Sequence, residues 1–185
     1  MYTWVSIKKL FVFYQNFIKL LTNFFYICNM KENFRLKCDE TLKDFKCLLS
    51  RYQEVKDDVK LFKMFMTRNR NPLWDLSNST ELRTGLKSKR VIESNVKGVE
   101  DHFIQRSKAM KNIFFELNNN PDMELDSFIV LLRKYSSTVE LTKEEHGRVT
   151  GLSPSREVLN YQLYSELGIE VEGLEKLMIE NNIPF

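Results

Sequence analysis

Residues 158–172 read VLNYQLYSELGIEVE, and the hydrophobic period changes in the middle of this stretch. Up to Leu167 the apolar side chains recur at helical spacing. Gly168 is then expected to end the helix, because glycine readily adopts the left-handed conformation found at helix C-termini. Ile169 and Val171 alternate with glutamates, which predicts a short strand with one apolar face. The stretch therefore predicts a junction between a helix and a strand.

The residues around this junction predict a small α+β element over 147–185. Ser153 and Pro154 form a typical helix start, in which a capping residue precedes a proline at the first helical position. Gly173 allows a turn, after which the apolar residues 177–179 predict a return strand. Two short strands form only a marginal sheet. We therefore expect a partner chain, or residues missing from the C-terminus, to complete it.

The composition favours a helical protein. The chain has 185 residues, which is enough for one modest domain or for a helical arm with a small domain attached. Only 6 glycines and 4 prolines are present, and this scarcity favours long helices. The net charge of +3 resides in residues 1–29, which contain three lysines and no acid. Because the composition changes at residue 30, Met1 and Met30 both remain candidate translation starts.

Acidic residues dominate the C-terminal part of the chain. Residues 116–185 contain thirteen acidic and six basic side chains. This excess of acidic residues is not typical of a protein that binds nucleic acid, because such proteins carry clusters of lysine and arginine. It is more typical of a protein that binds partner proteins through their basic segments. We therefore predict protein partners and no nucleic acid.

The most apolar segment comprises residues 4–28. Lys8, Lys9 and Lys19 interrupt it, so no uncharged run approaches the ~20 residues that span a bilayer. Its apolar residues recur at steps of three and four, which predicts an amphipathic helix. Packing on its own chain, binding a partner and lying on a membrane surface all remain open for it. A membrane is a predicted partner only through this segment.

Residues 30–146 predict a helical region with coiled-coil-like seams. The first helix is expected over 31–67, where an apolar residue occupies nearly every third or fourth position. A break is expected near 69–80, where a proline and several capping residues cluster. A helix with a weaker seam is expected over 81–117, and a second break near 118–122.

The clearest seam lies in a helix expected over 122–146, which Gly147 is predicted to stop. Its apolar residues at helical spacing are Leu125, Phe128, Leu132, Tyr135 and Val139. These patterns together predict a mainly α protein built of interrupted amphipathic helices. Residues 1–29 are expected to form an N-terminal helix or extension, and the small α+β element is expected at the C-terminus.

The sequence carries no signature of catalysis or of cofactor binding. The phosphate-binding loop, the dinucleotide-binding glycine pattern, the zinc-protease helix and the nucleophile elbow are all absent from it. His102 and His146 are far apart, and Cys28, Cys38 and Cys47 lack the close spacing of zinc ligands. We read the cysteines as reduced thiols. We therefore predict a non-enzymatic protein that has no cofactor and no metal and is not secreted.

A family resemblance covers the last quarter of the chain. It is carried by Leu163-Tyr164-x-x-Leu167-Gly168-Ile169 within residues 158–172, and it continues through residues 175–181. These residues resemble the Spc-type subunits of the outer-kinetochore NDC complex. In that family a coiled coil runs into a small RWD-like domain that opens with such a junction. The family continues for more strands and helices than this chain has, so the resemblance implies an incomplete RWD-like domain.

The resemblance implies a structural subunit that links the centromere to microtubules during chromosome segregation. Residues 31–146 would pair as a coil with a sister Spc subunit and join the microtubule-binding arm, although Pro72 and Pro121 interrupt that coil. The C-terminal part would help to receive helical peptides from inner-kinetochore linkers. The residues expected to bind partners are Leu125, Phe128, Leu132, Tyr135, Val139, Leu163, Tyr164, Leu167, Ile169 and Val171. The chain would then belong to a nuclear, kinetochore-bound hetero-oligomer, or act in the cytoplasm.

Two other functions remain open when the resemblance is set aside. The helices would then form a bundle that serves as a subunit of some other assembly. Alternatively, the chain would be a peripheral membrane protein that is held at the membrane by residues 4–28.

Overall fold

A computed structural model describes residues 30–69, 71–152 and 160–180 of the chain. The elements in chain order are α2 (Glu32–Val55), α3 (Val59–Asn69), α4 (Asn71–Ser77), the 3-10 turn η1 (Thr80–Leu82), β1 (Arg83–Lys87), α5 (Lys89–Ser94), β2 (Val99–His102), α6 (Arg106–Asn119), α7 (Leu125–Ser136), β3 (Thr138–Leu141), α8 (Lys143–Leu152), α9 (Asn160–Glu166) and α10 (Leu174–Glu180). The predicted fold class is confirmed, because the described chain is mainly helical with one small sheet.

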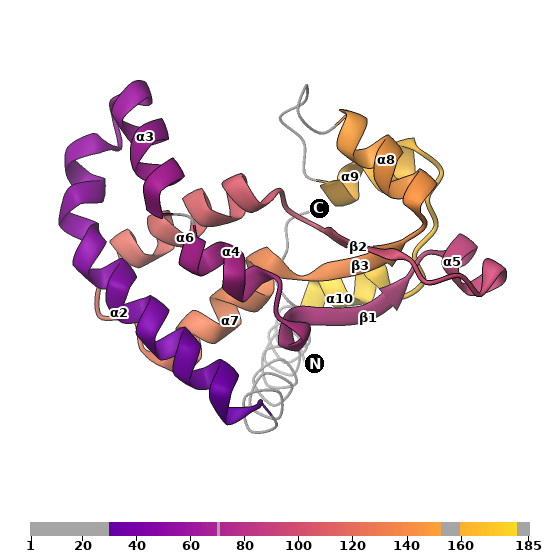
Figure 1. Ribbon diagram of the computed structural model, residues 1–185, viewed down its shortest axis with the longest axis horizontal. Coiled ribbons are helices and arrows are strands. Elements are labelled where there is room, and N and C mark those ends of the chain that lie inside the picture. The colour runs from indigo at the N-terminus through magenta and orange to yellow at the C-terminus, as the bar shows by residue number, and fades with distance from the viewer. Residues whose placement is uncertain (1–29, 70, 153–159, 181–185) are drawn as a thin grey trace, which may run out of the picture.

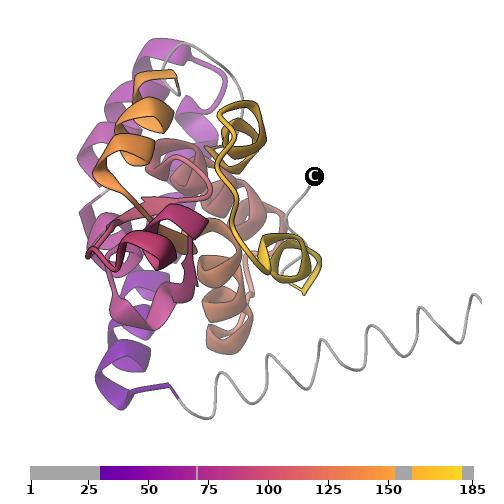
Figure 2. The ribbon, with the colours of Figure 1, turned by 90° about the vertical axis from the view of Figure 1, so that its right-hand side faces the viewer.

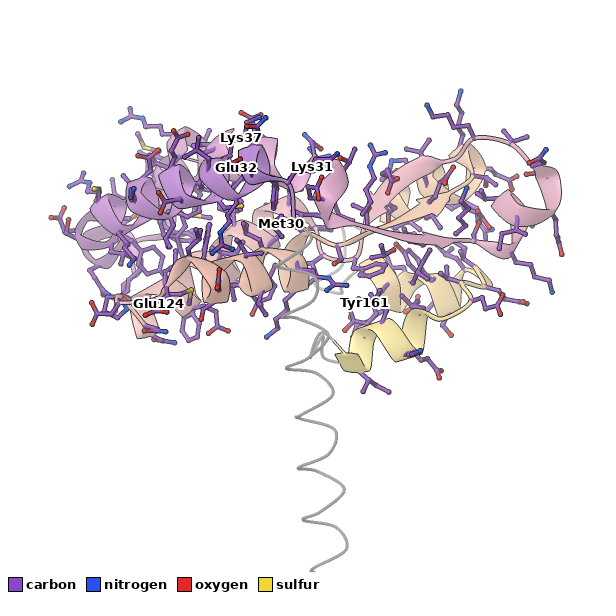
Figure 3. All side chains as sticks on the ribbon, turned by 90° about the horizontal axis from the view of Figure 1, so that it is seen from below. Met30, Lys31, Glu32, Lys37, Glu124 and Tyr161 are labelled. Carbon is purple, nitrogen blue, oxygen red and sulfur yellow. The ribbon has the colours of Figure 1, made fainter. Side chains whose placement is uncertain are left out.

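The elements gather in two halves (Figure 1). One half contains α2, α3, α4, α6 and α7, and the other contains the sheet with α5, α8, α9 and α10. Figure 2 shows α9 and α10 following one another along one side of the sheet half. In Figure 3, α2 starts near the boundary between the halves, at Met30 and Lys31, whereas Glu124 lies at the outer end of the helical half. Tyr161 lies in the sheet half.

An aromatic cluster forms the core of the helical half, where α2 packs on both α6 and α7. The ring centroid of Phe45 lies 4.7 Å from that of Phe114 and 6.2 Å from that of Phe128. Tyr52 stacks on Phe114 at 5.5 Å between centroids. Burial of each such side chain contributes roughly 1.5–3 kcal/mol. One apolar face of α2 is therefore buried against other helices of the same chain.

The helix expected over 31–67 is two helices. Helix α2 ends at Val55, and α3 begins at Val59 and packs back on α2. Asp58 accounts for the break, because its carboxylate accepts a hydrogen bond from the Leu61 backbone N–H at 2.8 Å. A carboxylate in this position caps a helix start. The apolar positions that look continuous in the sequence are therefore divided between two helices that pack on each other.

The sheet is formed by the middle of the chain. Strand β3 lies at its centre, parallel to β1 and antiparallel to β2. The helix expected over 81–117 is wrong in its first half, because β1, α5 and β2 occupy residues 83–102. Asn95 ends α5 in a left-handed conformation with φ of 51°. At Gly98 the strands approach so closely that a Cβ atom would lie 2.5 Å from the Leu141 carbonyl oxygen.

The helix expected over 122–146 is wrong beyond Ser136, where α7 ends and β3 follows. Gly147 lies inside α8 instead of stopping a helix. A reciprocal cap starts α8. The Thr142 N–H donates to the Glu145 carboxylate at 2.9 Å, and the Glu145 N–H donates to the Thr142 hydroxyl at 3.2 Å. This capping box interrupts the predicted helix with a new helix start.

The C-terminal junction is only partly as expected. Gly168 has a φ of 64° and follows the end of α9, as predicted. The strand expected at residues 169–171 is reduced to one isolated bridge between Val171 and Ser88. The return strand expected over 177–179 is wrong, because these residues lie in α10. A short apolar run fits a buried helix face as well as a strand, and here the helix forms.

Some expectations concern residues outside the described ranges. They are the amphipathic helix over 4–28, the helix start at Ser153 and Pro154, and the first two residues of the resemblance, Val158 and Leu159. Within the part of the chain that the structure describes, every helix is too short or too polar to cross a membrane.

Candidate binding groove

An open groove is lined by residues of α3, β2, the start of α6 and α8. In Figure 1, β2 and the start of α6 lie between α3 and α8. The groove has a volume of about 1020 Å³. Its lining comes from residues 59–67, 99–102, 105–111 and 146–150. Sites for small molecules typically measure about 300–1,000 Å³, so this groove lies at the upper end of that range.

The α3 wall of the groove is apolar. Helix α3 turns Phe65 into the core, and Val59, Phe62 and Met66 line the groove. Val59 is 86% exposed, the largest exposure of any large apolar side chain in the described residues. Solvent around such a side chain is released when a partner covers it. The wall is therefore a candidate contact surface.

The charged lining of the groove is mostly basic. Four basic side chains, one from α3 and three from the start of α6, are Lys63, Arg106, Lys108 and Lys111. Glu100 and Asp101 are the acids in this lining. Glu100 pairs with Arg83 at 3.4 Å, and its carboxylate also accepts a bond from the Thr138 hydroxyl. The net charge of the groove lining is therefore positive, whereas that of the C-terminal part of the sequence is negative.

Asp101 is a buried carboxylate, 2% exposed, that joins three elements at the groove. The Tyr164 hydroxyl of α9 donates to one of its oxygens at 2.5 Å, and His146 Nδ1 of α8 lies 3.1 Å from the other. An ionised carboxylate only accepts hydrogen bonds, so Nδ1 carries a proton and Nε2 faces away from Asp101. Burial, and then the charge and hydrogen bond of Asp101, raise the pKa of Tyr164 well above its usual value. The phenol therefore remains a donor.

His102 follows Asp101 on β2 and is neutral at physiological pH. Burial, and then the nearby charge of Arg106, lower its pKa to about 4. The Arg106 Nε–H donates to His102 Nε2 at 2.9 Å, which requires an unprotonated ring nitrogen. This hydrogen bond positions Arg106 in the first turn of α6, beside the groove.

The groove combines an apolar wall, several cations and one imidazole that is oriented by a carboxylate. These groups can bind an anion. The Thr150 hydroxyl donates to the backbone carbonyl of His146 at 2.8 Å and not to its ring. No cluster of three or more His, Cys, Asp or Glu side chains that could hold a metal occurs among the residues that the structure describes.

Most of the predicted partner-binding residues lie in the core of this chain. The buried ones are Phe128, Leu132, Tyr135, Val139, Leu163, Tyr164 and Ile169, and the half-buried ones are Leu125, Leu167 and Val171. The first five predicted positions do not share one helix, because Val139 lies on β3. That these ten residues bind a partner stays a prediction. Of the ten, Tyr164 belongs to the hydrogen-bond network beside the groove.

The groove itself was not predicted from the sequence. One local signal was present, because residues 106–111 read RSKAMK and place three bases within two helical turns. His102 and His146 looked isolated in the sequence, but both line the groove. Only the folding of β2 next to α8 brings these residues together.

Comparison with known proteins finds no matching family model, no matching curated protein and no matching solved structure.

Proposed function

We propose that this chain is a non-enzymatic binding subunit whose groove receives an amphipathic helical segment of a partner protein. The observation that carries the proposal is the apolar α3 wall, where Val59 is 86% exposed beside Phe62 and Met66. Partner helices commonly lay an apolar face into a groove of this kind. The volume of about 1020 Å³ can accommodate several side chains of such a segment.

Charge indicates which kind of segment would fit. The groove contains four basic side chains, and its two acids, Glu100 and Asp101, already have partners within the fold. A segment with acidic residues beside its apolar face would therefore be attracted. Such contacts at a groove rim are screened by salt, so binding should weaken as ionic strength rises.

The buried seams favour the groove as the docking surface. Phe128 and Leu132 are fully buried under α2 and α6, so pairing through them would require α7 to leave the core. The groove is preformed and needs no such rearrangement. A partner that binds there gains the α3 contacts without the free-energy cost of opening the fold.

A finer proposal concerns the assembly to which the partner belongs. The resemblance of residues 158–181 to Spc-type subunits supports a partner in the outer kinetochore and a role in chromosome segregation in the nucleus. The same resemblance implies binding of helical peptides, which agrees in kind with the proposed groove ligand. This finer proposal rests on sequence likeness alone.

Two exposed valines allow a matched test. Val59 lies in the groove, whereas Val96 is 62% exposed between α5 and β2 and does not line it. The full chain and its Val59→Asp and Val96→Asp variants are used for affinity purification from native cells. A co-purifying chain is then produced separately, and its Kd is measured with each variant. Val59→Asp should weaken binding at least about tenfold, because a charge replaces methyl groups that the bound partner would bury. Val96→Asp should leave binding unchanged.

Equal binding by both variants would rule out the α3 wall as the docking surface. Melting curves of the two variants provide the folding control, because both substitutions are at exposed positions. Recovery of kinetochore subunits as the Val59-dependent partner would support the finer proposal. Recovery of an unrelated chain whose binding also depends on Val59 would support the groove as a docking surface but not a partner in the kinetochore.

A further inference from the structure

We propose that the groove binds a phosphoryl group carried by the partner segment, between α3 and the first turns of α6. This inference rests on the proposed binding function and names the chemistry that the groove recognises. Three features support it: the placement of the basic side chains, the occupation of the nearby acids and the chemistry of the remaining wall.

Basic side chains line the groove from two elements, α3 and α6, and His146 of α8 lines it as well. Lys63 belongs to α3, Lys111 to α6 and His146 to α8, and all three side chains line the groove. Arg106 and Lys108 lie in the first turn of α6. Lys111 Nζ lies 5.9 Å from the centroid of the Phe62 ring, which places this α6 cation against the α3 wall that also carries Lys63. A phosphoryl group presents three acceptor oxygens and about −1.5 to −2 charge, whereas a carboxylate presents two oxygens in one plane. The phosphoryl group therefore matches the arrangement better.

The acids that line the groove are outnumbered by its bases and are occupied. Four bases against Glu100 and Asp101 leave the lining with a formal charge of +2, before any protonation of His146. Glu100 is paired with Arg83, and both Asp101 oxygens are occupied by Tyr164 and His146. The lining as a whole therefore favours an anionic ligand.

His146 is oriented beside the groove by Asp101. Its Nδ1 lies 3.1 Å from an Asp101 oxygen, so Nε2 is directed away from that carboxylate. Asp101 on β2 contacts this ring directly.

The rest of the groove indicates what carries the phosphoryl group. The volume far exceeds that of a phosphate ion, so the group must belong to a larger ligand. The wall of Val59, Phe62 and Met66 is mainly aliphatic, unlike the stacked aromatic platforms that bind single-stranded nucleic acid. We therefore assign the group to a phosphorylated serine or threonine in a protein segment.

The test is an NMR titration of the full chain with inorganic phosphate at constant ionic strength. Saturable shifts are expected at the His146 ring and at the amides of residues 106–111. Lys63→Gln and Lys111→Gln should each weaken phosphate binding about threefold or more, which is the scale of one partly exposed ion pair. Lys89→Gln is the matched control, because Lys89 lies in the sheet half, where it pairs with Glu170, and it should leave binding unchanged.

Shifts that do not saturate, or that respond equally to Lys63→Gln and Lys89→Gln, would overturn the inference. A short oligothymidylate provides a second probe. If it binds the same residues at least about a hundredfold more tightly than phosphate, the site is for nucleic acid and the assignment to a phosphorylated protein is wrong. The two proposals remain distinguishable, because Val59→Asp tests partner docking without phosphate. If phosphate fails to bind but partner binding still depends on Val59, the phosphoryl inference is wrong and the proposed partner docking stands.

Discussion

The protonation of a single side chain, that of His102, is coupled to folding. Its pKa is about 4 in the folded chain, lowered first by burial and then by Arg106. An unfolded histidine titrates near pH 6.5. Because the unfolded state takes up the proton first, the stabilisation is fully present above about pH 6.5 and is lost as the pH falls toward 4.

The predicted consequence is a fall in the free energy of unfolding of about 2–3 kcal/mol across this pH range. Urea unfolding at a series of pH values measures it. Carboxylates also titrate near the lower limit, so the comparison is with His102→Gln, which can accept from Arg106 but does not titrate. The variant should show a flatter profile between pH 6.5 and 4. An identical profile in both proteins would mean that His102 does not contribute.

The packing of elements makes opposite predictions for two glycines. A Cβ on Gly98 would lie 2.5 Å from a carbonyl oxygen of β3, so Gly98→Ala should force β2 away and destabilise the chain by about 2 kcal/mol. Gly147 lies in α8, and a Cβ atom added to it would meet no atom within 4 Å, so Gly147→Ala should stabilise by about 0.5–1 kcal/mol. Chemical denaturation of both variants measures the difference. Equal effects would contradict the close strand contact.

Elements with a sustained period were predictable, and short elements were not. Helix α2 has 24 residues, so its apolar positions at steps of three and four are unmistakable. Strand β2 has four residues and ends in Asp101 and His102, which are buried through hydrogen bonds and not through apolarity. No alternation of apolar and polar residues marks it. The capping box at Thr142 and Glu145 was present in the sequence and should have divided the predicted helix.

For the whole molecule, the location of the groove could not be predicted from local patterns. Its walls come from residues 59–67, 99–111 and 146–150, which are brought together by the chain reversals after α2 and β3. From the sequence we predicted helices whose apolar faces pair with a partner chain. In the structure most of the seam positions lie in the core, whereas Val59, Phe62 and Met66, the last positions of the seam expected over 31–67, form the α3 wall of the groove.

The central claim is that the chain fills its own helical seams and leaves the groove as the binding surface. Hydrogen exchange on the purified full chain tests this most directly. We predict that amides in α2, α6 and α7 around Phe45, Phe114 and Phe128 exchange only by global unfolding, at rates independent of protein concentration. Protection of α7 that appears only at high concentration, or only with a second chain present, would contradict the claim and favour a helix that pairs with a partner.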